Sequence, residues 1–333
     1  MKALAEKIRA ARSILLSTHK DPDGDGIGAV LALALALRGA GTEIHVRLPD
    51  PVPERFRFLD PEGILVHLEN GREDLGCPPP DLALMIDTHQ WALLGRVGEL
   101  IRSSGVPVLF LDHHPVRGAV RADVYGNPDS CSTGELVYRL ILHYLDLPID
   151  ARIATCLYAS VAYDTHSFRY VRNSPSPHIV AADLISRGVD ATEVYRHLFA
   201  SNPVGKMRLL GRLLGAIQIE EEGELALVGL PLDWMRQHEV CEDDLRDTVN
   251  FMLEFNHVEV AVLLREVEGG ETRVSFRSKG RTEIHEAALS LGGGGHAFAA
   301  GATVAGTLDE ARARVLDAVI PLIRRTKGSP CGS

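Results

Sequence analysis

Short apolar runs alternate with helical patterns through the first half of the chain, and this alternation limits the possible folds more than any other feature. Apolar runs with the length of buried strands occur at Ser13–Thr18, Glu43–Leu48, Leu82–Ile86 and Val106–Leu111. Helical patterns occur at Ile27–Arg38, Trp91–Arg102, Ser132–Leu145, Ala151–Tyr163 and Pro177–Arg187. Strands that alternate with helices in this way predict an α/β fold, in which helices cover both faces of a mainly parallel sheet.

The pattern changes after about residue 188, which predicts a second domain. The segment Asp190–Ala216 is mostly helical, and Pro203 is expected to interrupt it. Strand patterns then occur at Leu225–Leu230, Val258–Val267 and Thr272–Ser278, and helical patterns at Glu283–Leu291 and Leu308–Arg325. A length of 333 residues also favours two domains over one.

The charge balance and the apolar runs restrict the partners of the protein. The 35 basic and 45 acidic residues give a net charge of −10, which argues against binding to long duplex nucleic acid. The longest apolar run, Ile27–Leu37, is far shorter than the roughly 20 residues of a membrane-spanning helix. The five cysteines contain no Cys-x-x-Cys pair, which suits a reducing compartment. We therefore expect a cytoplasmic protein without a membrane partner.

Acidic and imidazole residues gather just after three of the predicted strands and after one predicted helix. The clusters contain His19, Asp23 and Asp25, then Asp87 with His89, then Asp112, His113 and His114, and finally Asp164. The carboxyl ends of parallel strands converge on one crevice, so clusters that are distant in sequence can build one site. Carboxylates and imidazoles together suit Mn²⁺, and also Mg²⁺ and other first-row cations.

Each cluster also has a simpler interpretation. The first is compatible with a solvated acidic turn, and Asp87 with a helix cap. A calcium loop that starts at Asp21 is excluded, because Ala32 stands where that loop needs a glutamate. The adjacent histidines are harder to explain structurally: one could bind a metal and the next face substrate, while Asp112 orients an imidazole. We expect Gly24 and Gly26 to let the backbone turn sharply between the carboxylates.

The order of these motifs resembles the DHH-type phosphoesterases. His-x-x-x-Asp-x-Asp, a strand-end Asp, Asp-His-His and a later Asp-Thr occur in the order of that family. In the second half, Val274–Lys279 and Gly292–Gly301 resemble the DHHA1 domain. The resemblance covers about residues 10–305 and is greatest to the NrnA-like subfamily of short chains. It implies a doubly wound DHH domain at 1–187, a helical linker at 188–208 and a smaller mixed α/β DHHA1 domain at 209–326. The remaining residues, 327–333, are rich in glycine, serine and proline, which predicts a flexible tail.

The resemblance also implies roles for individual residues. His19, Asp23 and Asp87 would bind one divalent cation. Asp25, Asp87, His113 and Asp164 would bind a second, so that Asp87 bridges the two. His114 would contact the scissile phosphate, with Asp112 and Asp87 beside it in the catalytic centre. The rest of the substrate would be held by Arg277, Gly292, Gly293, Gly294, Gly295 and His296.

The implied activity is the hydrolysis of short oligonucleotides such as nano-RNA and linear pApA, and removal of the 3′-phosphate of pAp. Mn²⁺ is the expected cation, with Mg²⁺, Co²⁺ or Fe²⁺ as alternatives. Two cations about 3.5–4 Å apart can activate water and neutralise phosphate charge. Backbone N–H groups of a glycine run can cradle an anion, although four glycines are also compatible with a flexible loop. Related proteins suggest a homodimer.

Two alternatives remain open at this stage. The chain could be a DHH phosphoesterase for another substrate, such as short single-stranded DNA, or a nucleotide sensor without catalysis. The sensor is disfavoured because every expected ligand position is filled. The chain departs from the NrnA-like pattern at Gly26, where alanine or serine is usual, and at His166, where glycine often follows Asp-Thr. These departures remove no ligand, but they leave the substrate preference open.

Overall fold

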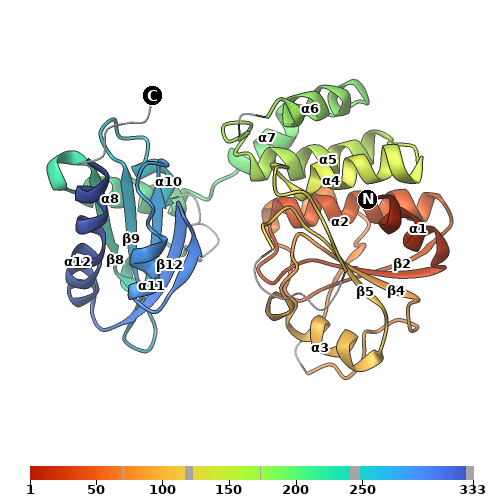
Figure 1. The fold of residues 1–333 in the computed structure, drawn as a ribbon, viewed down its shortest axis with the longest axis horizontal. Coiled ribbons are helices and arrows are strands. Elements are labelled where there is room, and N and C mark those ends of the chain that lie inside the picture. The colour runs from red at the N-terminus through yellow and green to blue at the C-terminus, as the bar shows by residue number, and fades with distance from the viewer. Residues whose placement is uncertain (70, 117–122, 173, 241–247, 328–333) are drawn as a thin grey trace. The chain divides into compact units, whose positions relative to one another are not determined.

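The computed structural model describes residues 1–69, 71–116, 123–172, 174–240 and 248–327. The chain divides into two compact units, Met1–Ser201 and Asn202–Ser333 (Figure 1). Among the described helices, none combines the length and the apolar character needed to cross a membrane.

The first unit is built on a parallel sheet. Its described strands are β1 (Ser13–Ser17), β2 (Glu43–Leu48), β3 (Leu65–His67), β4 (Leu82–Ile86), β5 (Val108–Leu111) and β6 (Asp123–Tyr125). They lie in the order β3-β2-β1-β4-β5-β6, and every described pair is parallel. The chain winds outward from β1 to β3 and then returns to β4 on the other side of β1. The predicted doubly wound α/β fold is therefore confirmed, and the winding direction reverses between β1 and β4.

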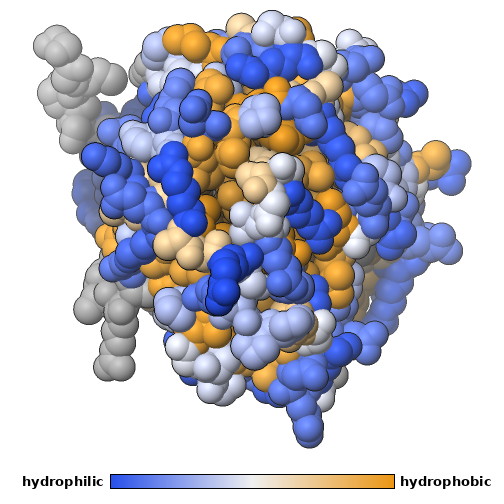
Figure 2. All heavy atoms as spheres, turned by 90° about the vertical axis from the view of Figure 1, so that its right-hand side faces the viewer, coloured by the Kyte–Doolittle hydropathy of each residue, from blue (hydrophilic) through white to orange (hydrophobic). Residues whose placement is uncertain are grey.

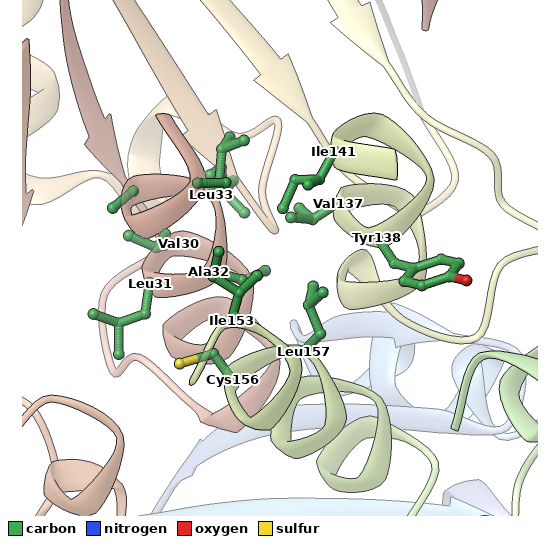
Figure 3. Packing of buried hydrophobic residues seen from close by; sticks show 14 of the residues in the cluster. Val30, Leu31, Ala32, Leu33, Val137, Tyr138, Ile141, Ile153, Cys156 and Leu157 are labelled. Carbon is green, nitrogen blue, oxygen red and sulfur yellow. The ribbon is translucent and has the colours of Figure 1, made fainter. Parts of the chain in front are cut away.

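Helices cover both faces of this sheet (Figure 1). They are α1 (Lys2–Ala10), α2 (Gly24–Gly39), α3 (Gly95–Ser104), α4 (Thr133–Arg139), α5 (Ala151–Asp164), α6 (Ser176–Ser186) and α7 (Ala191–Phe199), with shorter helical segments η1 (Glu54–Leu59), η2 (Trp91–Leu93) and η3 (Leu140–Leu145). Helix α2 is apolar on almost every side, which is typical of a helix buried all round. Its side chains belong to one buried cluster with those of α4, η3 and α5, and Figure 3 shows Leu33, Val137 and Leu157 on three of these helices around their shared interior.

The two faces of the sheet are filled by alternating residues of the same strands. Ile14 and Leu16 of β1 belong to the core beneath α2, whereas Leu15 belongs to the core beneath α3. This alternation follows from the two-residue period of a strand. Figure 2 shows one face of the molecule, on which apolar side chains gather in the middle and hydrophilic ones surround them.

The second unit contains a mixed sheet. Its described strands are β7 (Gln218–Glu220), β8 (Leu225–Leu230), β9 (Val260–Val267), β10 (Glu271–Ser278), β11 (Gly294–His296) and β12 (Ala299–Ala305), in the order β11-β12-β10-β9-β8-β7. Only β8 and β9 are parallel among the described pairs. The described helices are α8 (Val204–Ala216), α9 (Leu232–Gln237), α10 (Thr248–Met252), α11 (His285–Ser290) and α12 (Leu308–Lys327), together with η4 (Glu221–Gly223). Helices α11 and α12 share one apolar core with the sheet, and α8, α9 and α10 share another.

The structure agrees with the sequence expectations at two prolines and differs from them elsewhere in detail. Strand β5 begins after Pro107, which has no backbone N–H to donate. Pro203 separates α7 from α8, as expected. Strands β3, β6, β7, β11 and β12 were not predicted, because they are short or rich in glycine and alanine. Helix α12 extends to Lys327, and residues 328–333 of the predicted tail lie outside the described ranges.

Candidate metal centre

The predicted ligands of the first unit come together where the winding of the sheet reverses. His19 follows β1, Asp87 follows β4 directly, and His113 follows β5. Asp23 is the N-cap of α2, where its carboxylate accepts hydrogen bonds from two backbone N–H groups of the first turn. Asp164 is the last residue of α5. Strand ends, one helix start and one helix end thus direct their polar side chains into the same space.

The ligand atoms form two groups, each small enough to surround one cation. In the first, His19 Nε2 lies 3.4 Å from Asp87 Oδ2 and 3.8 Å from Asp23 Oδ1. In the second, His113 Nε2 lies 3.5 Å from Asp164 Oδ2 and 3.8 Å from Asp25 Oδ2. His113 Nε2 is also 3.7 Å from Asp87 Oδ1. The two oxygens of Asp87 therefore face one group each.

Hydrogen bonds on the far side of both imidazoles leave Nε2 available to a cation. His19 Nδ1 lies 2.7 Å from the carbonyl oxygen of Lys20, and His113 Nδ1 lies 3.2 Å from that of Ser130. A carbonyl oxygen can only accept, so Nδ1 of each ring must carry the hydrogen. Nε2 then faces the carboxylates, which is the arrangement expected of metal-binding histidines, and a cation would replace any proton that this nitrogen carries.

The charges of the cluster also fit divalent cations. Burial and the neighbouring Asp87 carboxylate raise the pKa of Asp25 well above its ordinary value, and the same causes raise the pKa of Asp164 to about 8. Burial lowers the pKa of His19, but hydrogen bonds to Asp23 and Asp87 outweigh it and raise that pKa to about 11. By itself the cluster therefore holds protons to offset its excess negative charge. Bound cations would offset the same charge.

Asp25 is held in place by residues that the sequence motifs did not indicate. Its oxygens accept hydrogen bonds from the backbone N–H groups of Thr133, at 2.7 Å, and Gly134, at 3.0 Å, and from the hydroxyl of Ser160. The Thr133 hydroxyl donates to Asp87 Oδ1 at 2.8 Å. The start of α4 thus binds one carboxylate as helix N-termini bind anions. The helical pattern predicted from Ser132 had located this helix start, in agreement with its Ser-x-x-Glu capping sequence, but it did not indicate the contact with Asp25.

Gly24 and Gly26 do not form the sharp turn that we expected. Both lie in the first turn of α2, and their value is their small size. A Cβ atom on Gly24 would lie 2.5 Å from the ring of Tyr163, and one on Gly26 would lie 2.4 Å from the hydroxyl oxygen of Thr18. The ligand-bearing end of α2 can therefore approach its neighbours only if these positions lack a side chain.

Asp112 connects two imidazoles. Its Oδ1 accepts from the backbone N–H of His114 at 3.0 Å and lies 2.7 Å from the ring Nδ1 of the same residue, while Oδ2 lies 2.5 Å from Nδ1 of His89. Burial would raise the pKa of Asp112, but these donors lower it to about 2. Burial likewise lowers the pKa of His114, and its bond to Asp112 raises it to about 9. Asp112 is therefore ionised and His114 positively charged at neutral pH.

A cavity of about 200 Å³ opens over this cluster. Its lining consists of His19, Asp23, Asp87, Thr88, Gln90, Leu93, Asp112, His114 and Asp164. The His114 side chain is 44% exposed, whereas those of Asp87 and Asp112 are almost completely buried. A ligand that enters the cavity can thus reach the His114 ring together with four of the predicted cation ligands, His19, Asp23, Asp87 and Asp164.

The predicted substrate residues belong to the second unit. Arg277 lies on β10, and its guanidinium donates to the carbonyl oxygen of Phe276. Gly294, Gly295 and His296 form β11, which pairs with β12. The backbone N–H groups of Gly292 and Gly293 donate to carbonyl oxygens of α11. We had expected the N–H groups of the glycine run to be exposed. Those of Gly292 and Gly293 are instead hydrogen-bonded at the end of α11.

Fold and site together define a two-domain α/β protein with a candidate two-cation centre, a construction suited to hydrolysis of phosphate esters. Residues 13–161 match the N-terminal domain of the DHH family, and residues 227–324 match the DHHA1 domain. The chain belongs to this DHH/DHHA1 family of phosphoesterases, as its motifs predicted.

Relatives of known name agree with this assignment. The chain is 34% identical over 96% of its length to the bifunctional oligoribonuclease and PAP phosphatase NrnA of Thermus thermophilus, 93% of which is covered. It is 24% identical over 69% of its length to the NrnA of Bacillus subtilis, 78% of which is covered. An exopolyphosphatase-related protein from Bacteroides fragilis has the same fold, with a TM-score of 0.88 at 24% identity, over 98% of this chain and 96% of that one.

Proposed function

We propose that this protein hydrolyses the phosphodiester bonds of short oligonucleotides, such as nano-RNA and pApA, and removes the 3′-phosphate of pAp. The observation that carries the proposal is the position of Asp87, whose two oxygens face two separate ligand groups. That arrangement suits a pair of cations that share one carboxylate. The names of the curated relatives from Thermus and Bacillus support the choice of substrate.

The chain's own residues would divide the work as follows. His19, Asp23 and Asp87 would hold one cation, and Asp25, Asp87, His113 and Asp164 the other. When bound, the cations supply Lewis acidity, which makes water more acidic and neutralises phosphate charge. His114 is positively charged at neutral pH, and its ring reaches the cavity, so it would donate a hydrogen bond to the anionic phosphate. Asp112 would hold that ring in orientation.

The second unit would bind the part of the substrate that does not react. Arg277 offers a planar guanidinium that can hold a terminal phosphate through two hydrogen bonds. Gly294, Gly295 and His296 would contribute from β11. A net charge of −10 suits a small anionic substrate whose charge is offset locally, and it disfavours a long polymer.

We propose Mn²⁺ as the preferred cation. The candidate ligands are carboxylate oxygens together with two imidazole nitrogens. Hard oxygen ligands alone would suit Mg²⁺ well, but nitrogen ligands shift the preference toward first-row transition metals.

A matrix of cations and substrates tests the proposal. The purified protein is supplied in turn with Mn²⁺, Mg²⁺ and Co²⁺, and with pApA, pAp, a short RNA, a short single-stranded DNA and a long duplex. We expect the fastest turnover for pApA and short RNA with Mn²⁺, measurable release of phosphate from pAp, and no cleavage of the duplex. Faster cleavage of single-stranded DNA would favour the alternative DHH substrate, and tight binding without turnover would favour a sensor.

A further inference from the structure

His89 is a buried histidine beside the candidate metal centre, and no motif assigns it a role. It lies two residues after Asp87, on the connection that follows β4, and only 8% of its surface is exposed. Its Nδ1 lies 2.5 Å from Asp112 Oδ2. The contact joins the ends of two neighbouring strands, because Asp112 follows β5 directly.

The carboxylate of Asp112 uses its two oxygens for different partners. Oδ1 holds His114 through both the backbone N–H and the ring Nδ1, and Oδ2 holds His89. The side chain of Asp112 is 1% exposed, so water cannot readily replace a lost partner. Rotation of the carboxylate would break the bonds on both sides at once. The orientation of His114 therefore depends on the bond that His89 makes.

Both ends of this arrangement are fixed by the backbone. The N–H of Asp87 donates to the carbonyl oxygen of Leu111, which ties the end of β4 to that of β5. On the other side of His89, the N–H of Gln90 donates to the hydroxyl of Thr88 at 3.1 Å. The backbone on both sides of His89 is thus hydrogen-bonded, and its side chain is only 7% exposed, so the ring has little room to move away from the carboxylate.

We infer that His89 is a positioning residue, which holds Asp112 through Oδ2 and thereby keeps the His114 ring aimed into the cavity. This inference rests on the proposed function, in which His114 contacts the reacting phosphate. Hydrogen-bond partners that orient the residues of a metal site typically contribute about 10- to 100-fold to metal affinity or activity. Loss of the His89 donor should therefore lower kcat by about that factor and change KM much less, because His114 acts on the phosphate as it reacts.

A matched pair of substitutions tests the position of the donor. In His89→Asn the amide nitrogen is attached to Cγ, as Nδ1 is in histidine, so it can still donate to Asp112. In His89→Gln the same amide lies one bond further out. We expect the asparagine variant to retain most of the wild-type kcat on pApA with Mn²⁺, and the glutamine variant to lose about 10- to 100-fold. A purely space-filling role predicts the reverse order, since glutamine is closer to histidine in volume, and that order would overturn the inference.

Two further measurements separate this inference from the proposed function. In a His114→Ala background, the glutamine substitution should cause little additional loss of kcat, because its effect passes through the missing ring. Full additivity of the two losses would contradict the inference. The nitrogen NMR signals of His114, recorded with diamagnetic Mg²⁺, should move in the glutamine variant and stay near their wild-type positions in the asparagine variant. This measurement does not require turnover. An inactive wild type would therefore contradict only the proposed function, whereas His114 signals that do not move in the glutamine variant would contradict the inference.

Discussion

Cation binding to the candidate metal centre should release protons, and the number of protons follows from the charges in the cluster. The pKa of His19 is raised to about 11 and that of Asp164 to about 8, so both groups hold a proton at pH 7. The pKa of Asp25 is raised in the same direction. A cation binds only to the deprotonated forms of these groups. We therefore expect at least two protons to be released when the site is filled at pH 7.

The size of this effect can be expressed as the change in cation affinity with pH. Each displaced proton weakens binding by about 1.4 kcal/mol for every unit of pH below the pKa of the group concerned. The logarithm of the overall association constant for both cations should therefore rise by at least about two per pH unit below the pKa of Asp164, which is about 8. Above that pH the slope should fall by about one, since Asp164 no longer carries a proton. His19 continues to compete with the cation until its pKa of about 11 is reached.

The raised pKa values of Asp164 and His19 also determine how the stability of the cation-free protein changes with pH. An aspartate whose pKa is raised by folding favours the folded state at low pH, and that contribution is lost as pH rises through the raised value. The cation-free protein should therefore lose stability as pH rises toward about 8, and cations should raise its unfolding temperature more on the alkaline side of that range. The contribution of His19 has the same sign, because it is fully present below the unfolded pKa of 6.5 and is lost as pH rises through about 11.

Isothermal titration calorimetry in buffers of different ionisation enthalpy counts the protons directly. Mn²⁺ and Mg²⁺ are titrated into the cation-free protein at several pH values. His19→Gln serves as the matched variant, which should release about one proton fewer than the wild type because one titrating group is gone. Release of less than one proton at pH 7, with cation affinity intact, would refute the electrostatic account of the cluster.

Three further predictions follow from individual contacts. Asp87→Ala should lower turnover by more than about 100-fold, which is the upper end of the loss typical for hydrogen-bond partners of metal ligands, while circular dichroism shows that the fold is retained. Activity near the wild-type level would contradict a position of this carboxylate between two cations. Gly28→Ala should destabilise the protein by about 1–3 kcal/mol, because its Cβ would lie 2.4 Å from the carbonyl oxygen of Cys156. Gly39→Ala is the matched control at the end of the same helix, with no atom within 4 Å of the added Cβ, and chemical denaturation should detect no loss there. Arg277→Ala should raise KM for pApA with little change in kcat, and an unchanged KM would remove this guanidinium from substrate binding.

The amino-acid sequence by itself determined much of the fold. The bounds of β2 and β4 agree with the predicted runs, because each is a short apolar or alternating segment between residues that end strands. It also indicated which residues would meet, since His19, Asp87 and His113 each follow a strand of a parallel sheet. Local chemistry and a simple topological rule were sufficient for this part, and the family comparison agrees with it.

Only the tertiary structure decided how these residues are supported. Ser160 donates to Asp25 across 135 positions of the chain, and His89 meets Asp112 across 23. No periodicity or spacing encodes such contacts, because they depend on how packed helices and strand ends come together. The same holds for Gly24 and Gly26, which the sequence predicted to form a turn but which allow α2 to pack closely against its neighbours. The candidate ligands can thus be recognised from local sequence, whereas the hydrogen bonds that orient each of them arise only when distant segments pack.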